Sequence, residues 1–469
     1  MNPLELPAAD FRRLADRLTT LAEQWLAGLD SRRIAPATQG ADTEALFAEG
    51  LPETGLGALV LDTLSPVLEG ARAGNARFLG YVLGSGEPVG ALGDYLASVL
   101  NQNVTAWRSS PVAVSLERAV VRGLAAAVGC PGFTGSLTGG GSMANLMGLA
   151  MAREARAPAN EEGAPSGVVY ASSEVHMSIP KALALLGLGR RNLRLIPTDS
   201  AWRMRPEALE RAISEDVAAG RRPLAVVATA GTVNTGAVDP LPAVADITRR
   251  HGLWLHVDGA YGAFAALAVP ELFEGLALAD SLSLDAHKWL YQPVDCGLLL
   301  FREAAAARKA FSFSGDYVRT TSADAVEGFA FFEESLELSR RARALKLWLS
   351  VRYHGLAAFR EAIRRDLEHA RLLAERVRAE ARLELLAPVP LSAVCFRYAG
   401  EVPEAERDAF NAQLLARLNS RGRVYLSNAT LAGRFALRAC FVNHRTTPED
   451  VETVVFEVLE AAAERLPLR

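Results

Sequence analysis

Lysine is scarce in this 469-residue chain. Lys and Arg together number 50, but lysine occurs only at positions 181, 288, 309 and 346, so few side chains could form a Schiff base. Cysteine is also rare, and the sequence contains no C-x-x-C pair and no Cys/His ligand spacing. The cysteines are Cys130, Cys296, Cys395 and Cys440. This pattern predicts reduced, buried thiols and argues against a disulfide framework or a structural metal site.

Long apolar runs and an excess of positive charge are missing as well. No segment reaches the roughly 18 apolar residues that a membrane-spanning helix needs. The first ten residues, which include Glu5 and Asp10, lack the basic and apolar regions of a signal peptide. The formal net charge is −4, which disfavours nucleic acid as a partner. We therefore expect a cytoplasmic protein that binds neither nucleic acid nor a membrane.

The composition is that of a packed globular protein, with 50% hydrophobic and 22% charged residues. At roughly 150 residues per domain, two or three structural units are expected. We place an N-terminal helical segment at 1–100, a large α/β domain at 101–340 and a small α+β domain at 341–469. In the first segment, apolar residues recur at helical spacing from Phe11 to Trp25, and this face must pack either on the body of the chain or on a second subunit.

Short apolar segments alternate with helical stretches from about Phe133 onward, which predicts an α/β domain with a mostly parallel sheet. The expected strands are 168–171, 193–196, 224–229, 253–257, 281–284 and 297–301. Ligands of such sheets bind at the carboxyl ends of the strands. The segment from Phe311 to Phe331 is small and polar without a sustained period, and we expect a mobile functional loop there.

A lysine follows one of these strands in the sequence Ser-Leu-Asp-Ala-His-Lys-Trp, residues 283–289. A lysine placed at a strand's carboxyl end, between His287 and Trp289, is poorly solvated and suited to lose its proton and attack a carbonyl. Read alone, Lys288 fits an ordinary surface lysine at a strand end better than a catalytic one.

A second strand ends in Asp258, within Trp-Leu-His-Val-Asp-Gly-Ala-Tyr, residues 254–261. Strand alternation puts Asp258 at the ligand crevice, and Gly259 and Ala260 allow a flat ring to approach closely. By itself this aspartate could also cap the next helix. We interpret His256, two residues further inside, as a core histidine.

The third segment, Thr-Gly-Gly-Gly-Ser at 138–142, follows a short strand and opens a helix. Its backbone N–H groups and the helix N-terminus form a plausible phosphate cradle, although a tight loop is the commoner use of such glycines. The spacing matches neither a Walker loop nor G-x-G-x-x-G, which argues against a Rossmann oxidoreductase.

Together, a phosphate cradle, a slot for an aromatic ring, an acid and a nucleophilic lysine are what pyridoxal phosphate requires. On these motifs the sequence resembles the group II pyridoxal-phosphate-dependent amino-acid decarboxylases, which include aromatic-amino-acid, glutamate and cysteine-sulfinate decarboxylases. The resemblance runs from Arg77 to Cys440. It implies the type I pyridoxal-phosphate fold, aspartate-aminotransferase-like, and a homodimer with shared active sites.

The resemblance also implies roles for individual residues. Lys288 would hold the cofactor as a Schiff base, and Asp258 would pair with its ring nitrogen, above a floor at Ala260. His176 would stack on the ring, and Tyr317 would protonate the substrate carbon. The residues expected around the phosphate are Gly140, Gly141, Ser142 and His287.

Two positions depart from the pattern of the relatives. Aromatic decarboxylases carry Asn-Pro-His-Lys where this chain has Asp285-Ala286-His287-Lys288, and we leave Asp285 out of the site because a carboxylate would repel phosphate. Val233 stands where relatives often have Thr, which puts a polar contact in doubt.

The resemblance favours decarboxylation of an L-α-amino acid to an amine and carbon dioxide. An aminotransferase or a decarboxylation-coupled aldehyde synthase on the same fold remains an alternative, as does a protein that keeps the fold without turnover. Apolar residues in the segments that select the side chain favour a bulky or aromatic substrate. They are Phe78, Leu79, Val82 and Trp107.

Overall fold

The computed structural model describes residues 2, 4–163, 166–313 and 324–464. Its largest element is a seven-stranded sheet in the order β1-β7-β6-β5-β4-β2-β3, in which only β7 runs antiparallel to its neighbours. The strands are β1 (Thr134–Thr138), β2 (Val168–Ser172), β3 (Leu193–Ile196), β4 (Pro223–Thr229), β5 (Trp254–Asp258), β6 (Ser281–Asp285) and β7 (Gly297–Phe301). All six strands expected from the sequence are present, and the α/β fold class is confirmed.

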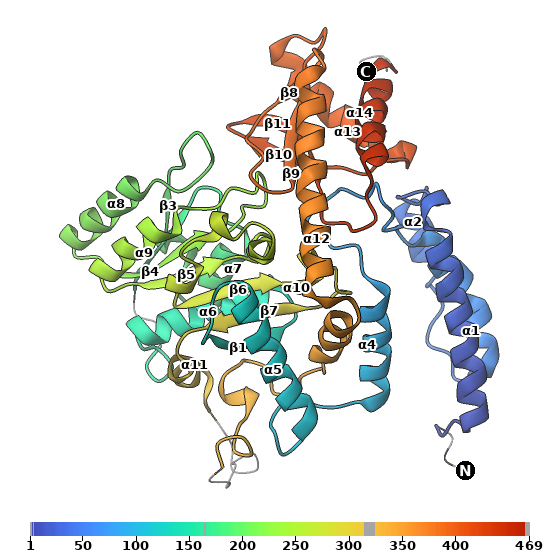
Figure 1. Ribbon diagram of the computed structural model, residues 1–469, viewed down its shortest axis with the longest axis horizontal. Coiled ribbons are helices and arrows are strands. Elements are labelled where there is room, and N and C mark those ends of the chain that lie inside the picture. The colour runs from blue at the N-terminus through green and yellow to red at the C-terminus, as the bar shows by residue number, and fades with distance from the viewer. Residues whose placement is uncertain (1, 3, 164–165, 314–323, 465–469) are drawn as a thin grey trace.

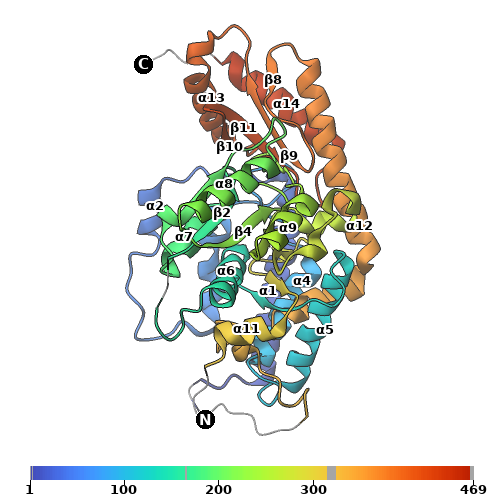
Figure 2. The same cartoon turned by 90° about the vertical axis from the view of Figure 1, so that its left-hand side faces the viewer.

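Helices cover both faces of this sheet, which explains why its strands read as nearly continuous apolar runs (Figure 2). One face packs against α6 (Gly141–Arg156), α7 (Ser178–Leu185) and α11 (Ala304–Phe311). The other packs against α5 (Pro111–Ala127), α8 (Pro206–Ala218) and α9 (Leu241–Arg250). The short helix α10 (Ala286–Trp289) follows β6 directly.

A smaller antiparallel sheet lies toward the C-terminus, in the order β10-β11-β9-β8 (Figure 1). Its strands are β8 (Leu383–Leu385), β9 (Ala393–Tyr398), β10 (Ser427–Leu431) and β11 (Arg434–Cys440). The helices α13 (Arg407–Arg421), α14 (Pro448–Ala463) and the later part of α12 (Ala344–Ala379) share its core. Helix α12 bends at Gly355, where φ is 76°, and connects the two sheets.

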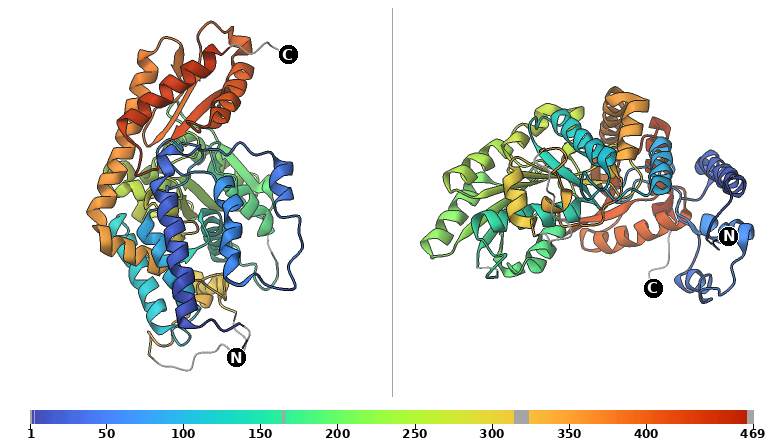
Figure 3. Two further views of the ribbon diagram at one scale, coloured as in Figure 1. Left: turned by 90° about the vertical axis from the view of Figure 1, so that its right-hand side faces the viewer. Right: turned by 90° about the horizontal axis from the view of Figure 1, so that it is seen from below.

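The N-terminal segment is helical, as expected; its first helices stand away from the rest of the chain, whereas its last helix, residues 88–100, packs against α12 (Figure 3). Its elements are α1 (Ala8–Ala27), α2 (Gly40–Ala45), the 3₁₀ helix η2 (Gly57–Leu64), α3 (Ser65–Gly70) and α4 (Pro88–Leu100). No residue of α1 is buried. The apolar face predicted from Phe11 to Trp25 therefore has little of this chain to pack on. Among the described residues, no helix is both long and apolar enough to cross a membrane.

Candidate active site

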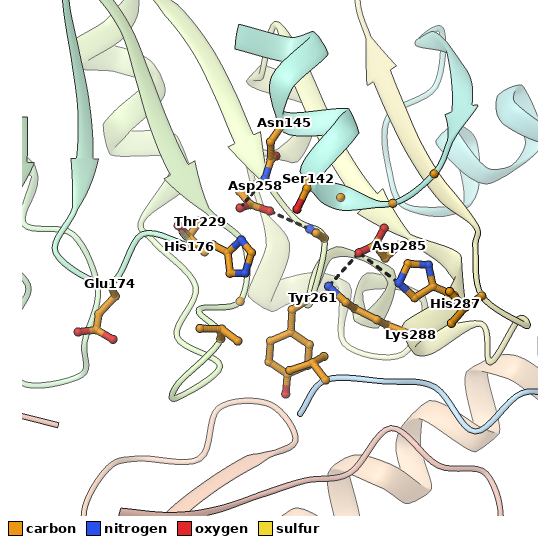
Figure 4. A pocket seen from close by; sticks show the side chains of 18 residues that line it. Ser142, Asn145, Glu174, His176, Thr229, Asp258, Tyr261, Asp285, His287 and Lys288 are labelled. Atoms are coloured by element: carbon orange, nitrogen blue, oxygen red, sulfur yellow. Dashed lines mark hydrogen bonds and ion pairs between the residues drawn. The ribbon is translucent and has the colours of Figure 1, made fainter. Parts of the chain in front are cut away.

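One cavity of about 280 Å³ lies at the carboxyl ends of β1, β2, β4, β5 and β6. It brings together segments that are more than a hundred residues apart in the sequence (Figure 4). Its lining includes every described residue that the sequence assigned to the site, namely Gly140, Gly141, Ser142, His176, Asp258, Ala260, His287 and Lys288. Tyr317 lies outside the described residues.

Glycines at the end of β1 let three parts of the backbone approach closely. Gly140 has a φ of 131°, which side-chain-bearing residues rarely adopt. A Cβ on Gly141 would lie 2.6 Å from the Cβ of Ala260 and 2.9 Å from Asp285 Oδ2. Gly141 is also the first residue of α6, so the cavity meets the N-terminus of a 16-residue helix. This arrangement suits an anionic group such as phosphate.

Asp258 is 5% exposed at the end of β5, and both its oxygens accept hydrogen bonds. Oδ2 accepts from Asn145 Nδ2 at 2.9 Å, and Oδ1 accepts from Ser283 Oγ and the Ala260 N–H, each at 3.2 Å. Together these three donors fix the plane of the carboxylate. The contact to Ala260 closes the turn after β5 and is not a helix cap, because the next helix, Ala263–Leu267, has Gly262 as its N-cap residue and no side-chain capping bond.

Asn145 is a site residue that sequence reasoning missed. It is buried on α6, and its Nδ2 donates to Ser178 Oγ as well as to Asp258. Ser178 Oγ lies 2.8 Å from His176 Nδ1, so one amide connects the aspartate to the histidine. The signal available in the sequence was its position three residues after Ser142, one helical turn into α6.

His176 and His287 are both held as neutral donors. In each ring Nδ1 accepts a backbone N–H, from Ser178 at 3.3 Å and from Cys296 at 3.2 Å, which leaves the hydrogen on Nε2. Burial lowers the pKa of both imidazoles. Both rings therefore offer an N–H group without a positive charge.

His256 is fully buried, as expected of a core histidine. Its Nδ1 lies 2.8 Å from Ser281 Oγ and its Nε2 lies 2.9 Å from Asn145 Oδ1. Burial lowers its pKa to about 4. A neutral His256 thus holds the oxygen of Asn145 and directs its amide hydrogens toward Asp258 and Ser178.

Lys288 is the only one of the four lysines, all of which are described, that lines the cavity. Its Nζ lies 2.8 Å from Asp285 Oδ2. The exclusion of Asp285 from the site is therefore wrong, since its carboxylate lines the cavity beside Lys288 and Gly141. The sequence could not show this because the side chain's direction depends on the turn after β6.

Val233 lines the cavity, and its carbonyl accepts a hydrogen bond from the Arg438 guanidinium. Of the four apolar residues named in the segments that select the substrate side chain, only Val82 lines the cavity. Leu79 belongs to the core of the smaller sheet, and Trp107 packs against Phe331. Tertiary packing places these two side chains in other clusters of this chain.

Two buried polar atoms at the cavity have no hydrogen-bond partner among the described residues. They are Thr229 Oγ1 and Asp285 Oδ1. Buried polar atoms are normally paired, so both suggest a polar ligand. Pyridoxal phosphate fits the groups gathered here. They are the glycines Gly140 and Gly141, the N-terminus of α6, the carboxylate of Asp258 and the side chain of Lys288.

Comparison with known proteins identifies the class. The pyridoxal-dependent decarboxylase conserved domain matches residues 62–399, and this chain belongs to that family. It is 35% identical to an aromatic-L-amino-acid decarboxylase of Bacillus atrophaeus over 98% of this chain and 97% of the relative. It is 34% identical to a phenylacetaldehyde synthase of Petunia hybrida over 77% of this chain and 76% of the relative.

A solved structure shares the whole fold. Oryza sativa TDC with PLP and tryptamine superimposes with a TM-score of 0.91 at 28% identity, covering 99% of each chain. The protein is a pyridoxal-phosphate-dependent amino-acid decarboxylase with the fold of these enzymes.

Proposed function

We propose that this enzyme converts an aromatic or similarly bulky L-α-amino acid to its amine in the cavity around Lys288. The observation that carries the proposal is that Lys288 lines the same cavity as Asp258 and the glycine cradle of Gly140 and Gly141. The names of the relatives support an aromatic substrate, because one is an aromatic-L-amino-acid decarboxylase and another structure holds tryptamine.

Each residue has a role that follows from its chemistry. Lys288 would hold the cofactor covalently, and Asp258, as a hydrogen-bonded carboxylate, would keep a proton on the ring nitrogen. Pyridoxal phosphate supplies an electron sink for the charge left at the substrate α-carbon when carbon dioxide departs. His176 would lie against the ring face and fix its plane, with Ala260 on the other side as a floor.

The phosphate would lie against Gly140, Gly141 and Ser142. The neutral Nε2–H of His287 offers a further donor from the turn after β6. Tyr317 would deliver a proton to the substrate α-carbon, completing simple decarboxylation. That role rests on the resemblance of the sequence to the family.

The alternative product is an aldehyde, because one relative is a phenylacetaldehyde synthase. Incubating the purified holoenzyme with each proteinogenic amino acid, and measuring carbon dioxide, amine, aldehyde and keto acid, separates the possibilities. We expect equal amounts of carbon dioxide and amine from an aromatic substrate. Carbon dioxide with aldehyde would favour the aldehyde synthase, and keto acid without carbon dioxide would favour an aminotransferase.

A homodimer with shared active sites accounts for the exposed N-terminal segment. Large apolar side chains on it are open to solvent in the single chain, among them Phe11 (43% exposed), Phe47 (68%) and Leu92 (63%). A second copy presents the same apolar surface, and a two-fold interface is self-complementary. Obligate interfaces of this kind bury roughly 2,000 Å² or more. Light scattering should give twice the chain mass of 50.2 kDa, whereas an active species at 50.2 kDa would exclude the dimer.

We also propose a cytoplasmic enzyme with the domain division given above, 1–100, 101–340 and 341–469. All four cysteines are free and buried, which suits a reducing compartment.

A further inference from the structure

Thr229 carries a buried hydroxyl that has no hydrogen-bond partner in the described part of the chain. It is the last residue of β4, is 4% exposed and lines the cavity. Its backbone is already paired, because its N–H donates to Asp239 Oδ2 at 2.7 Å and its carbonyl accepts from the Asp239 N–H at 2.9 Å. A buried hydroxyl is costly unless it is hydrogen-bonded, so we expect Oγ1 to meet a polar group of the molecule that fills the cavity.

The register of the sheet fixes the side of the cavity on which this hydroxyl lies. Thr229 pairs with Asp258 across the parallel strands β4 and β5, so both side chains leave the same face of the sheet. Neighbouring strands are about 4.8 Å apart, which is the scale of a pyridine ring. Strand β6, which ends in Asp285, lies on the other side of β5. Figure 4 shows Thr229 on one side of Asp258, with Asp285 and Lys288 on the other.

The two edges of a pyridoxal phosphate ring carry different groups. The aldehyde carbon is opposite the ring nitrogen, and the phosphate arm and the 3-oxygen flank the aldehyde on opposite edges. In the proposed function the ring nitrogen meets Asp258 and the phosphate lies at the glycine cradle, where a Cβ on Gly141 would be 2.9 Å from Asp285 Oδ2. The phosphate edge then faces β6, and the edge with the 3-oxygen faces β4 and Thr229.

The other lining residues from β4 and the turn after it are poorly suited to bind an oxygen at that edge. They are Gly231 and Val233. The Gly231 N–H already donates to the Ala237 carbonyl at 3.1 Å, and the side chain of Val233 has no polar atom. The hydroxyl of Thr229 is therefore the side-chain donor that this part of the lining offers.

We propose that Thr229 Oγ1 donates a hydrogen bond to the 3-oxygen of pyridoxal phosphate and so holds the ring in position beside Asp258. The inference rests on the proposed function, which attaches the cofactor at Lys288 and puts its ring nitrogen at Asp258. The 3-oxygen carries negative charge, and hydrogen bonds to charged acceptors are stronger than those between neutral groups. Thr229 is thus a cofactor-binding residue, and its hydroxyl supplies a polar contact that the side chain of Val233 cannot make.

A binding cycle between the protein and the cofactor tests this contact directly. The full-length apoenzymes of wild type and Thr229→Val are titrated with pyridoxal phosphate and with 3-deoxypyridoxal phosphate, which lacks the 3-oxygen. The variant should bind pyridoxal phosphate about ten-fold or more weakly than the wild type does. It should bind the deoxy analogue as tightly as the wild type does. An equal loss of affinity for both ligands, or no loss for either, would overturn the inference.

Two further variants control this comparison. Thr229→Ser keeps the hydroxyl and should keep the preference for pyridoxal phosphate over the deoxy analogue; loss of that preference would count against the contact. Ser136 Oγ on β1 is also buried without a partner among the described residues, but Ser136 does not line the cavity. Ser136→Ala should bind both ligands as the wild type does. The selective loss expected of Thr229→Val, if seen in Ser136→Ala as well, would refute the assignment to Thr229.

Thermal melting separates cofactor binding from a structural role of the hydroxyl. Because Oγ1 bonds nothing in the described chain, Thr229→Val should melt no lower than the wild type when cofactor is absent. Added pyridoxal phosphate should raise the melting temperature of the variant less than that of the wild type, since it binds the variant more weakly. A lower melting temperature of the variant without cofactor would show that the hydroxyl stabilises the protein itself, and would contradict the inference.

Lys288→Ala distinguishes failure of this inference from failure of the proposed function. If pyridoxal phosphate still attaches covalently in Lys288→Ala, the proposed function fails at its first step and the inference fails with it. If attachment is lost in Lys288→Ala, but wild type and Thr229→Val show the same ratio of affinities for the two ligands, only the role of Thr229 fails.

Discussion

Replacing Asp258 by asparagine removes one negative charge from the end of β5 and keeps the shape of the side chain. The wild-type oxygens accept from three donors, the Asn145 amide, the Ser283 hydroxyl and the Ala260 N–H. The new amide has one oxygen and one NH₂ group, so at least one existing donor must face another donor. Such a mismatch in a buried site costs about 1–3 kcal/mol.

The effect on catalysis should be larger than the effect on folding. A charged partner held in a water-excluded site contributes about 2.7–4 kcal/mol to a transition state, which corresponds to about 10² to 10³ in kcat. KM should change little, because Asp258 acts on the cofactor ring and the substrate is held by other groups. Cofactor should remain bound, since Lys288 and the glycine cradle are untouched.

The assay is steady-state decarboxylation with cofactor content measured in the same samples. Wild type and Asp258→Asn should carry equal cofactor and differ in kcat by about two to three orders of magnitude. A kcat within a few-fold of wild type would show that Asp258 is merely a cap for the following turn. Loss of cofactor from the variant would refute the assignment of its role to turnover.

Three further changes test other parts of the structure. Asn145→Ala leaves Asp258 Oδ2 without its amide donor, so thermal melting should show a loss of about 1–3 kcal/mol in the free energy of unfolding. The variant should lower kcat and leave KM nearly unchanged. Unchanged kinetics would show that the amide has no positioning role. Tyr317→Phe removes an acidic proton, and product analysis should show little amine, with material diverted to oxidative or transamination products. Burial raises the pKa of Asp366 from 3.8 to about 7. The folded state then binds this proton more tightly than the unfolded state, so Asp366 contributes stability at low pH that is lost as pH rises toward 7. In Asp366→Asn the melting temperature should therefore fall less between low pH and pH 7 than it does in the wild type. The same pH dependence of melting temperature in both proteins would refute this role of Asp366.

The sheet and the position of the cavity follow from local sequence signals. Strands covered on both faces show as short apolar runs, and residues at their carboxyl ends meet at one edge whatever their separation in sequence. That is why Asp258 and Lys288, 30 residues apart, were placed together from the sequence.

Features that depend on tertiary contacts were not predictable in the same way. Asn145 matters because α6 packs across β5, which brings its amide to Asp258, 113 residues away. Leu79 lies in a segment expected to select the substrate side chain, but its backbone hydrogen-bonds Tyr425 and Cys440, and its side chain packs in the core of the smaller sheet. The direction of the Asp285 side chain is set by the turn into α10, which no spacing rule encodes.

The most direct test of the central claim is to locate the covalent attachment of the cofactor. Borohydride reduction of the holoenzyme followed by peptide mapping fixes the label on one lysine, and the chain offers only four. Lys346 is buried against Asp94, and Lys181 and Lys309 lie outside the cavity. The label is predicted on Lys288 alone, and a label on Lys181, Lys309 or Lys346 would contradict the assignment of this cavity as the active site.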